Sequence, residues 1–283
     1  MGLCNLDFKK LGKSDVDIPV LGLGTWGIGG FMSKHSGGEA DEVRALKLGL
    51  ELGMRFIDTA EIYARGHSEE VVAETVQQDR ENVFIATKVS AENLSFDGVI
   101  RSCESSLRRL RTSYVDLYQV HWPNTRIPIQ ETMRAMEKLM AEGKIRNIGV
   151  SNFSKKQTRE TQEALSKTSL ASNQVEYSLV ERSIEKELLP YCTSEHVTVI
   201  AYTPLGRGRF LEDRRDRGGR VLDEIASKYR KTKAQIALNW LIVKEPVVAI
   251  PKASNLEHVR ENAGAAGWKL SMEDQERLGE AFS

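Results

Sequence analysis

The strongest constraint on the fold is an alternation of short apolar runs with amphipathic stretches, which continues along nearly all of the 283 residues. The runs are rich in Val, Ile and Phe, and the stretches between them have helical spacing, which is the pattern of a parallel sheet. Eight such strands predict an α/β protein of the closed (β/α)8 type, a TIM barrel. The expected strands are residues 20–24, 55–59, 83–88, 115–121, 145–151, 171–177, 197–203 and 247–252.

Local signals predict how the elements begin and end. Helices are expected over 39–52 and 96–110, and a last short helix from residue 271. Residues 6–20 predict two short strands about a GKSD turn, an N-terminal β-hairpin that would plug the bottom of the barrel. The expected capping residues are Asp97 and Ser154 at helix N-termini and Gly53 and Gly143 at C-termini.

Composition narrows the class of protein. The hydrophobic content of 40% supports one large core, so we expect residues 1–283 to form a single domain. Forty basic residues balance forty acidic ones, so no net positive field favours nucleic acid or an anionic membrane. The segment 207–220 is basic but interrupted by acids, and we interpret it as a solvated loop whose first arginines are candidates for a phosphate contact.

Cysteine usage and apolar runs indicate the compartment. Cys4, Cys103 and Cys192 are widely spaced and form neither a CxxC pair nor a Cys/His metal motif, which disfavours disulfides and zinc. The first residues lack the apolar core of a signal peptide, and no apolar run reaches the roughly 18 to 20 residues that span a bilayer. We therefore expect a soluble, cytoplasmic protein without a metal site.

Gly22, Gly24 and Gly27 form a literal GxGxxG, the fingerprint of a Rossmann dinucleotide site. A Rossmann helix would open at once, yet another glycine-rich stretch follows. The next strand reaches its acid, Asp58, well beyond the usual spacing of about 20 residues. We reject that interpretation and expect the glycines to let a loop approach a ligand.

Four polar side chains stand where strands run out: Asp58, Tyr63, Lys88 and His121. Each alone has an ordinary structural explanation, such as a helix cap for the acid or core packing for the tyrosine. Because the carboxyl ends of barrel strands open onto one mouth, all four are expected to converge there.

Convergence of these four groups would create a proton donor. Tyr63 has an ordinary pKa near 10, and an ammonium such as Lys88 would bring it toward the working range. Asp58 would keep Lys88 charged and in place. His121 would hold the substrate oxygen by a hydrogen bond and assist proton transfer.

Eight motifs in order support the same chemistry: GLGTW, FIDTAEIY, ATKV, VHW, GVSNF, NQVEYSL, AYTPLGRG and IPKASNLEHVREN. From about residue 6 to 268 the chain resembles the aldo-keto reductases, NAD(P)H-dependent enzymes on a TIM barrel. The resemblance implies reduction of an aldehyde or ketone, with the same four residues as the catalytic set.

The resemblance also implies where the cofactor lies. Tyr202 would stack on the nicotinamide, whose carboxamide Ser151, Asn152 and Gln174 would hold, an arrangement suited to presenting one ring face. Lys252, Ser254 and Asn255 would bind the 2′-phosphate of NADPH ahead of a helix. The implied contacts also include Thr25, Trp26, Asp58, Leu205, Gly206, His258, Glu261 and Asn262.

One position departs from the family pattern. His258 stands where an arginine usually follows the lysine by six residues, so NADH is kept as a second cofactor, although Arg260 could compensate. Trp26 and Trp122 border the expected mouth and are candidate pocket walls. The chain ends soon after its last helix, without the longer loop of narrow-specificity members, so the pocket is expected to be open.

Two other functions stay open at this stage. The first is a cofactor-binding sensor or auxiliary subunit that binds nucleotide tightly but turns over slowly. The second is a barrel enzyme in which Lys88 forms a Schiff base, which Asp58 disfavours because an amine nucleophile must be neutral. The substrate, the direction of reaction and the oligomeric state are not fixed by the sequence.

Overall fold

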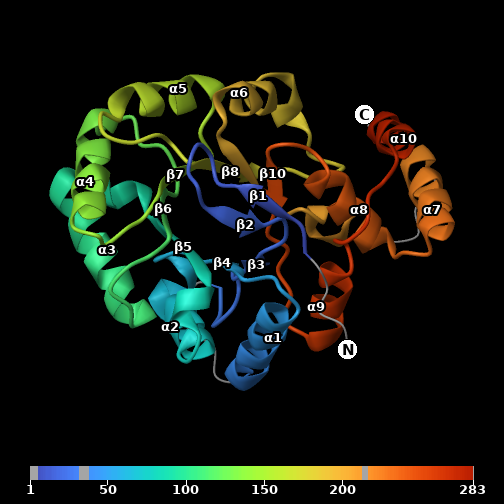
Figure 1. Cartoon of the computed structure of the whole chain (residues 1–283), viewed down its shortest axis with the longest axis horizontal. Coiled ribbons are helices and arrows are strands. Elements are labelled where there is room, and N and C mark those ends of the chain that lie inside the picture. Colours follow the sequence, from blue (N-terminus) through green and yellow to red (C-terminus); the bar gives the residue numbers. More distant parts are fainter. Residues whose placement is uncertain (1–5, 32–37, 212–215, 283) are drawn as a thin grey trace.

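The structure is a computed structural model that describes residues 6–31, 38–211 and 216–282. In this part of the chain, eight parallel strands pair in sequence order to form the central sheet. The sheet closes on itself because Gly22 N–H donates to Ala249 O at 2.8 Å and Ala249 N–H donates to Val20 O at 2.9 Å. Figure 1 looks along the barrel, with helices arranged around the strands, so the predicted (β/α)8 fold is confirmed.

Seven of the eight strands are shorter than the sequence predicts, at one end or at both, whereas the strand predicted over 83–88 keeps its length and lies one residue later. The first strand differs most, since residues 20–22 pair with the last strand while only Leu23–Gly24 pairs with the second. The barrel strands are β3 (Leu23–Gly24), β4 (Phe56–Asp58), β5 (Phe84–Val89), β6 (Leu117–Val120), β7 (Ile148–Ser151), β8 (Ser172–Glu176), β9 (Thr198–Tyr202) and β10 (Val247–Ala249).

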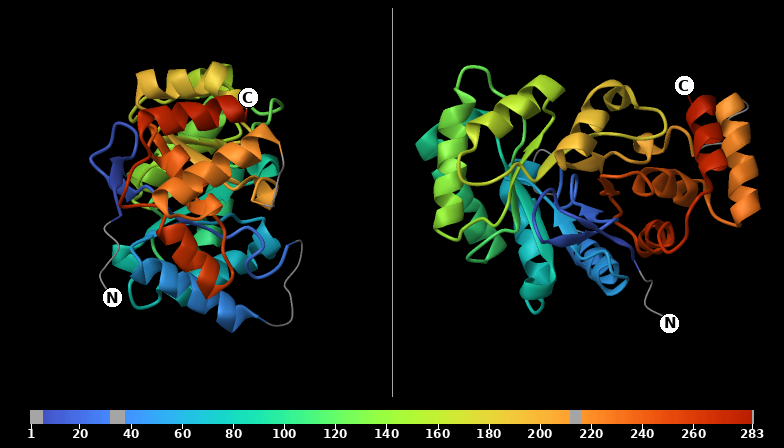
Figure 2. Two further views of the ribbon diagram at one scale, coloured as in Figure 1. Left: turned by 90° about the vertical axis from the view of Figure 1, so that its right-hand side faces the viewer. Right: turned by 45° about the horizontal axis from the view of Figure 1, so that its top comes forward.

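Helices cover the outside of the barrel. They are α1 (Glu39–Glu51), α2 (His67–Val76), α3 (Phe96–Leu110), α4 (Ile129–Ala141), α5 (Lys155–Ala164), α6 (Leu188–Glu195), α7 (Arg217–Tyr229), α8 (Lys233–Ile242), α9 (Leu256–Ala263) and α10 (Met272–Ala281). Figure 2 shows α7 and α10 side by side at one edge of the molecule, outside the ring of helices that packs on the strands. The predicted C-terminal helix is therefore present.

The helix caps follow the sequence with one correction. Ser154 caps α5 by accepting from Gln157 N–H, and Gly53 and Gly143 follow α1 and α4 with positive φ, as predicted. For α3, however, the N-cap is Ser95, whose hydroxyl accepts from Gly98 N–H. The predicted cap, Asp97, lies in the first turn instead, where its carboxylate interacts favourably with the positive end of the helix dipole.

An antiparallel hairpin of β1 (Phe8–Lys10) and β2 (Asp17–Pro19) closes the bottom of the barrel, as predicted. Its Leu11 and Ile18 are fully buried and pack against the inward side chains of the strands, including Phe56. Lys9 anchors it by donating to the carbonyl oxygens of residues 242, 244 and 247 at 2.7, 2.7 and 2.8 Å. The opposite, carboxyl end of the barrel is therefore the open one.

The glycine-rich start of the barrel packs closely and does not open a helix. A Cβ on Gly22 would lie 2.8 Å from the Phe56 ring, and one on Gly24 would lie 2.7 Å from Ile250 O. Gly22 therefore allows close packing inside the barrel, which corrects, for this glycine, the expectation that the glycines let a loop approach a ligand. Of Gly22, Gly24 and Gly27, only Gly24 lines the cavity at the mouth of the barrel.

The described residues also bear on the cysteine and membrane expectations. Cys103 and Cys192 are free and buried, whereas Cys4 lies outside the described residues. Within those ranges, no group of His, Cys, Asp and Glu side chains is arranged to hold a metal ion. No helix in the same ranges has the length and apolar character needed to cross a membrane.

Candidate active site

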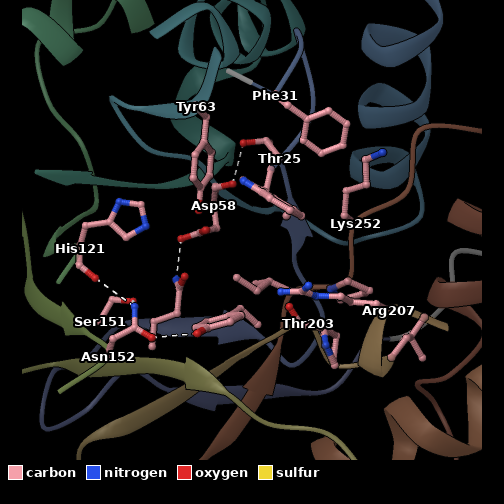
Figure 3. A pocket seen from close by; sticks show the side chains of 18 of the residues that line it. Thr25, Phe31, Asp58, Tyr63, His121, Ser151, Asn152, Thr203, Arg207 and Lys252 are labelled. Atoms are coloured by element: carbon pink, nitrogen blue, oxygen red, sulfur yellow. Dashed lines mark hydrogen bonds between the residues drawn. The ribbon is translucent and has the colours of Figure 1, made fainter. Parts of the chain in front are cut away.

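The carboxyl ends of the strands surround a cavity of about 670 Å³. Strand register brings the polar side chains together, because Asp58 pairs with Ala86 on β5 and Lys88 pairs with Gln119 on β6. Asp58, Tyr63 and His121 line the cavity, and Figure 3 shows them on one side of it, with Arg207 and Lys252 on the other. Lys88 lies beneath this layer and is 0% exposed.

An acid, an ammonium and a phenol form a continuous chain at the cavity floor. Lys88 Nζ donates to Asp58 Oδ1 at 2.5 Å, to Thr59 O at 2.8 Å and to Tyr63 Oη at 3.4 Å. The ammonium therefore uses its three protons on one carboxylate, one backbone carbonyl and the phenol. This geometry fixes the Tyr63 hydroxyl relative to a buried positive charge.

Electrostatics in this chain keep both Lys88 and Tyr63 protonated. Burial alone would lower the pKa of Lys88, but Asp58 and the phenol more than offset it, so this pKa is raised above its ordinary value. Burial raises the pKa of Tyr63, and Lys88 opposes that shift without cancelling it. The expected lowering of the Tyr63 pKa is therefore wrong for this structure, because desolvation outweighs the ammonium. A protonated phenol remains a donor.

His121 is a neutral imidazole in this site. Burial, together with the charge of Lys88, lowers the pKa of His121 to about 3. Its ring meets the edge of the Tyr63 ring at a centroid distance of 5.7 Å, and its Nδ1 is buried without a hydrogen-bond partner in the structure. A neutral ring in this position can donate a hydrogen bond to a ligand oxygen without carrying charge into the cavity.

Tyr63 is held by a backbone turn of unusual conformation, the 3₁₀ turn Tyr63–Gly66. Ala64, Arg65 and Gly66 have φ values of 47, 57 and 91°, a left-handed run that costs energy for the two residues with a Cβ. Arg109 packs directly beneath Gly66, where a Cβ would lie 2.6 Å from its Cδ. Packing from α3 thus supports the turn that aims the phenol.

Neutral hydrogen-bonding groups form a second side of the cavity. Asn152 has a φ of 64° and does not cap a helix; its Nδ2 donates to His121 O at 3.1 Å and its Oδ1 accepts from Tyr202 Oη at 2.8 Å. Gln174 is 2% exposed, and its Nε2 donates to Asp58 Oδ2 at 2.7 Å. Ser151 lines the cavity beside them. These groups can hold an uncharged amide.

A third side carries backbone and cationic groups. Thr203, Gly206, Arg207 and Gly208 have φ values of 50, 55, 58 and 81°, which curl the loop after β9 around the cavity. Leu205 and Arg207 line it, in keeping with the expected phosphate contact of the first arginine, whereas Gly206 does not. Thr25 supports the opposite wall, since its Oγ1 donates to Asp58 O at 2.9 Å.

The residues expected around the adenosine, apart from Lys252, lie beyond the cavity. Lys252 lines its edge and donates to Ser254 Oγ at 3.2 Å, while Asn255 caps α9 by accepting from His258 N–H at 2.8 Å. The His258 ring is exposed and contacts the Asn255 amide through Nδ1 at 3.1 Å. Two further expected contacts, Glu261 and Asn262, lie on α9 and do not line the cavity.

The rim of the cavity is apolar and exposed. Trp26 and Trp122, both expected there, are 55% and 50% exposed, and Trp26 meets Phe31 edge-on at a centroid distance of 5.3 Å. Sequence reasoning missed Phe31 and Ile62, which line the same cavity. The available signal was an apolar side chain in each of the two polar loops that follow β3 and β4.

Comparison with known proteins identifies the family to which this site belongs. The sequence model of the aldo/keto reductase family matches residues 20–282. The chain belongs to this family. Among curated aldo-keto reductase relatives, methylglyoxal reductase YeaE of Escherichia coli (strain K12) is 41% identical over 270 residues, covering 95% of this chain and 93% of that protein.

Solved aldo-keto reductase structures match the whole barrel. A thermostable aldo-keto reductase, Tm1743, crystallised with the inhibitor epalrestat, is 42% identical, with a TM-score of 0.93 over 98% of this chain and 100% of that one. An aldo-keto reductase of Klebsiella pneumoniae in complex with NADPH is 39% identical, with a TM-score of 0.89 over 98% of this chain and 95% of that one. Both identities are far above the level at which only a fold is shared.

Proposed function

We propose that this protein reduces small aldehydes and ketones with NADPH, and that reactive dicarbonyls such as methylglyoxal are among its substrates. The observation that carries the proposal is the chain Asp58–Lys88–Tyr63 at the floor of a cavity that also contains neutral His121. Family membership, the methylglyoxal reductase among its relatives and the NADPH complex among similar structures support it.

The residues around the cavity fit a nicotinamide cofactor. Asn152, Gln174 and Ser151 offer neutral groups for the carboxamide, and Tyr202 offers an aromatic platform beside them. Arg207 at the cavity wall and Lys252 at its edge supply positive charge for phosphate groups. When bound, the reduced cofactor supplies a hydride to the carbonyl carbon of the substrate.

The protein's own groups manage the proton and the substrate oxygen. Tyr63 Oη gives its proton to the carbonyl oxygen as the oxygen gains negative charge, so that the product is an alcohol. Lys88 stabilises the phenolate that remains, and Asp58 fixes Lys88. His121 donates a hydrogen bond to the same oxygen while staying neutral, and the apolar rim limits water around the reacting atoms.

Cofactor preference depends on the edge of the cavity. Lys252, Ser254 and Asn255 provide a cation, a hydroxyl and the N-terminus of α9, which suit a 2′-phosphate. His258 is exposed on the first turn of that helix and adds a single ring donor where an arginine would add a fork. We therefore propose NADPH as the preferred cofactor, with NADH as a weaker one, and Glu261 and Asn262 near the adenine.

The other roles considered for the sequence gain no support. Lys88 lies beneath the cavity, is fully buried and is held protonated by Asp58, so it is placed neither to reach a carbonyl carbon nor to attack one. No observation favours a cofactor-binding sensor over an enzyme. We further propose that the chain works as one catalytic domain in the cytoplasm.

Cofactor oxidation tests the proposal. Loss of the reduced nicotinamide absorbance should follow when the protein is mixed with NADPH and methylglyoxal, and it should be slower with NADH at equal concentration. A panel of aromatic aldehydes, ketones and sugars would then define the substrate class. Tight NADPH binding without oxidation across the whole panel would contradict an enzymatic role and favour the sensor.

A further inference from the structure

Gln119 is a polar side chain buried inside the barrel, outside the cavity and outside the predicted catalytic set. It lies on β6, two residues before His121, and pairs in register with Lys88 on β5. It is 0% exposed and does not line the cavity, so neither substrate nor cofactor can touch it there. Any influence that it has on the reaction must pass through a neighbour.

That neighbour is Asp58. Gln119 Nε2 donates to Asp58 Oδ2 at 3.2 Å, and Gln174 Nε2 donates to the same oxygen at 2.7 Å. Lys88 uses the other oxygen, Oδ1. The carboxylate is thus held from both sides, with its two oxygens assigned to different partners. Gln174 faces the cavity and Gln119 does not, so the Gln119 contact is the one that cavity contents cannot displace.

The amide of Gln119 is only half satisfied. Its Oε1 is buried and has no hydrogen-bond partner in the structure, an arrangement that normally costs stability. A side chain of similar shape without polar atoms would avoid that cost. The other half of the amide, the NH₂ group that donates to Asp58, is therefore the contact that explains a glutamine at this position. Residues that break local packing rules in this way are expected at functional sites.

We propose that Gln119 is a positioning residue that orients Asp58 so that Oδ1 stays directed at Lys88 and the Lys88 ammonium stays directed at Tyr63. The inference rests on the proposed reductase function. The positive end of the amide dipole also faces the carboxylate and offsets part of its negative charge at Tyr63. Removing the amide would let more of that charge reach the phenol, which disfavours the phenolate.

The test replaces the amide without changing its shape. Gln119→Met keeps the length of the side chain and removes the donor, and Gln119→Leu is a second donor-free variant if the thioether packs badly. Tyr118→Phe is the matched control, because Tyr118 is the preceding residue of β6, is fully buried and also carries a polar atom without a partner. The hydrogen bonds to the Asp58 carboxylate come from other residues.

We expect Gln119→Met to lower kcat roughly 10- to 100-fold, the scale of a small misplacement of reacting groups. The alkaline limb of its kcat profile should move to higher pH, while the NADP⁺ dissociation constant stays within about twofold and the urea midpoint stays equal or rises. Tyr118→Phe should match the wild type in turnover and pH profile. Tyr63 faces Lys88, Asp58, His121 and, further away, Tyr202, and both variants leave these groups unchanged.

Several outcomes would overturn the proposal. One is wild-type turnover in Gln119→Met; another is a loss of kcat that accompanies an equal loss of stability with no movement of the pH profile. If the wild type oxidises no NADPH, the proposed function fails, and the positioning claim is then decided by NMR titration of labelled Tyr63. A higher pKa of Tyr63 in Gln119→Met than in Tyr118→Phe would support it, and equal pKa values would refute it.

Discussion

His121 should make the fold acid-sensitive, and replacing it should remove part of that sensitivity. Burial and the charge of Lys88 lower the pKa of His121 to about 3, whereas an unfolded histidine titrates near 6.5. Above pH 6.5 the ring is neutral in both states and contributes no pH dependence. Between pH 6.5 and 3 the unfolded chain binds a proton that the folded chain rejects, so stability falls as the pH falls.

The size of the effect follows from that interval. Each pH unit within it is worth about 1.4 kcal/mol, so the fall from pH 6.5 to 4 removes about 3 kcal/mol of unfolding free energy through this one ring. His121→Asn carries no titrating group at the site. Its unfolding free energy should therefore fall by about 3 kcal/mol less than that of the wild type between pH 7 and pH 4.

Urea unfolding at the two pH values, followed by tryptophan fluorescence, measures this difference. Trp240 is 1% exposed and provides a buried reporter. His196→Asn is the control, because that residue is exposed and follows the C-terminus of α6 just before the amino end of β9, whereas the mouth is at the carboxyl ends of the strands. If His121→Asn and His196→Asn lose the same stability as the wild type on acidification, the desolvated neutral His121 described here is wrong.

Two further substitutions test other parts of the site. His258→Arg should tighten NADP⁺ about tenfold, because a guanidinium adds charge and a bidentate fork near the 2′-phosphate, and should leave NAD⁺ unchanged by fluorescence titration; equal gains for both cofactors would contradict this placement. Lys88→Met should lower the urea unfolding free energy by about 3 to 5 kcal/mol, because it leaves the Asp58 carboxylate buried without its cation. Adding Asp58→Asn should recover part of that loss, and no loss in the single variant would refute the buried pair.

The fold and the centre of the site were predictable because they depend on pattern. Apolar runs of strand length mark the barrel strands, and polar residues at their ends converge whatever the exact strand bounds are. The predicted bounds differed from the observed ones at both ends, because the side-chain pattern does not show where a backbone joins or leaves its ladder. The sequence did not distinguish Ser95 from Asp97 as the N-cap of α3, because both residue types are favoured at N-caps and the two lie only two residues apart.

Other features depend on depth and direction within the barrel, which the sequence does not state. Strand β6 is buried on both faces, so its sequence has no polar–apolar alternation that would show which face is inside the barrel. The sequence therefore does not show that Gln119 faces Asp58 while Tyr118 packs in the outer core. The pKa of Tyr63 depends on how completely the site is buried. Desolvation raises this pKa by more than the Lys88 ammonium lowers it, and the sequence indicated only the second effect. The apolar rim residues Phe31 and Ile62 lie in loops, where no periodicity marks them.

Turnover by Tyr63→Phe is the most direct test of Tyr63 as the proton donor. NADPH oxidation with methylglyoxal is compared with the wild type, and NADP⁺ binding is measured separately by fluorescence so that an intact site is established. We expect kcat to fall by about 10² to 10⁴, the usual contribution of a general acid, while the NADP⁺ dissociation constant is unchanged. Wild-type turnover in Tyr63→Phe would show that another group supplies the proton.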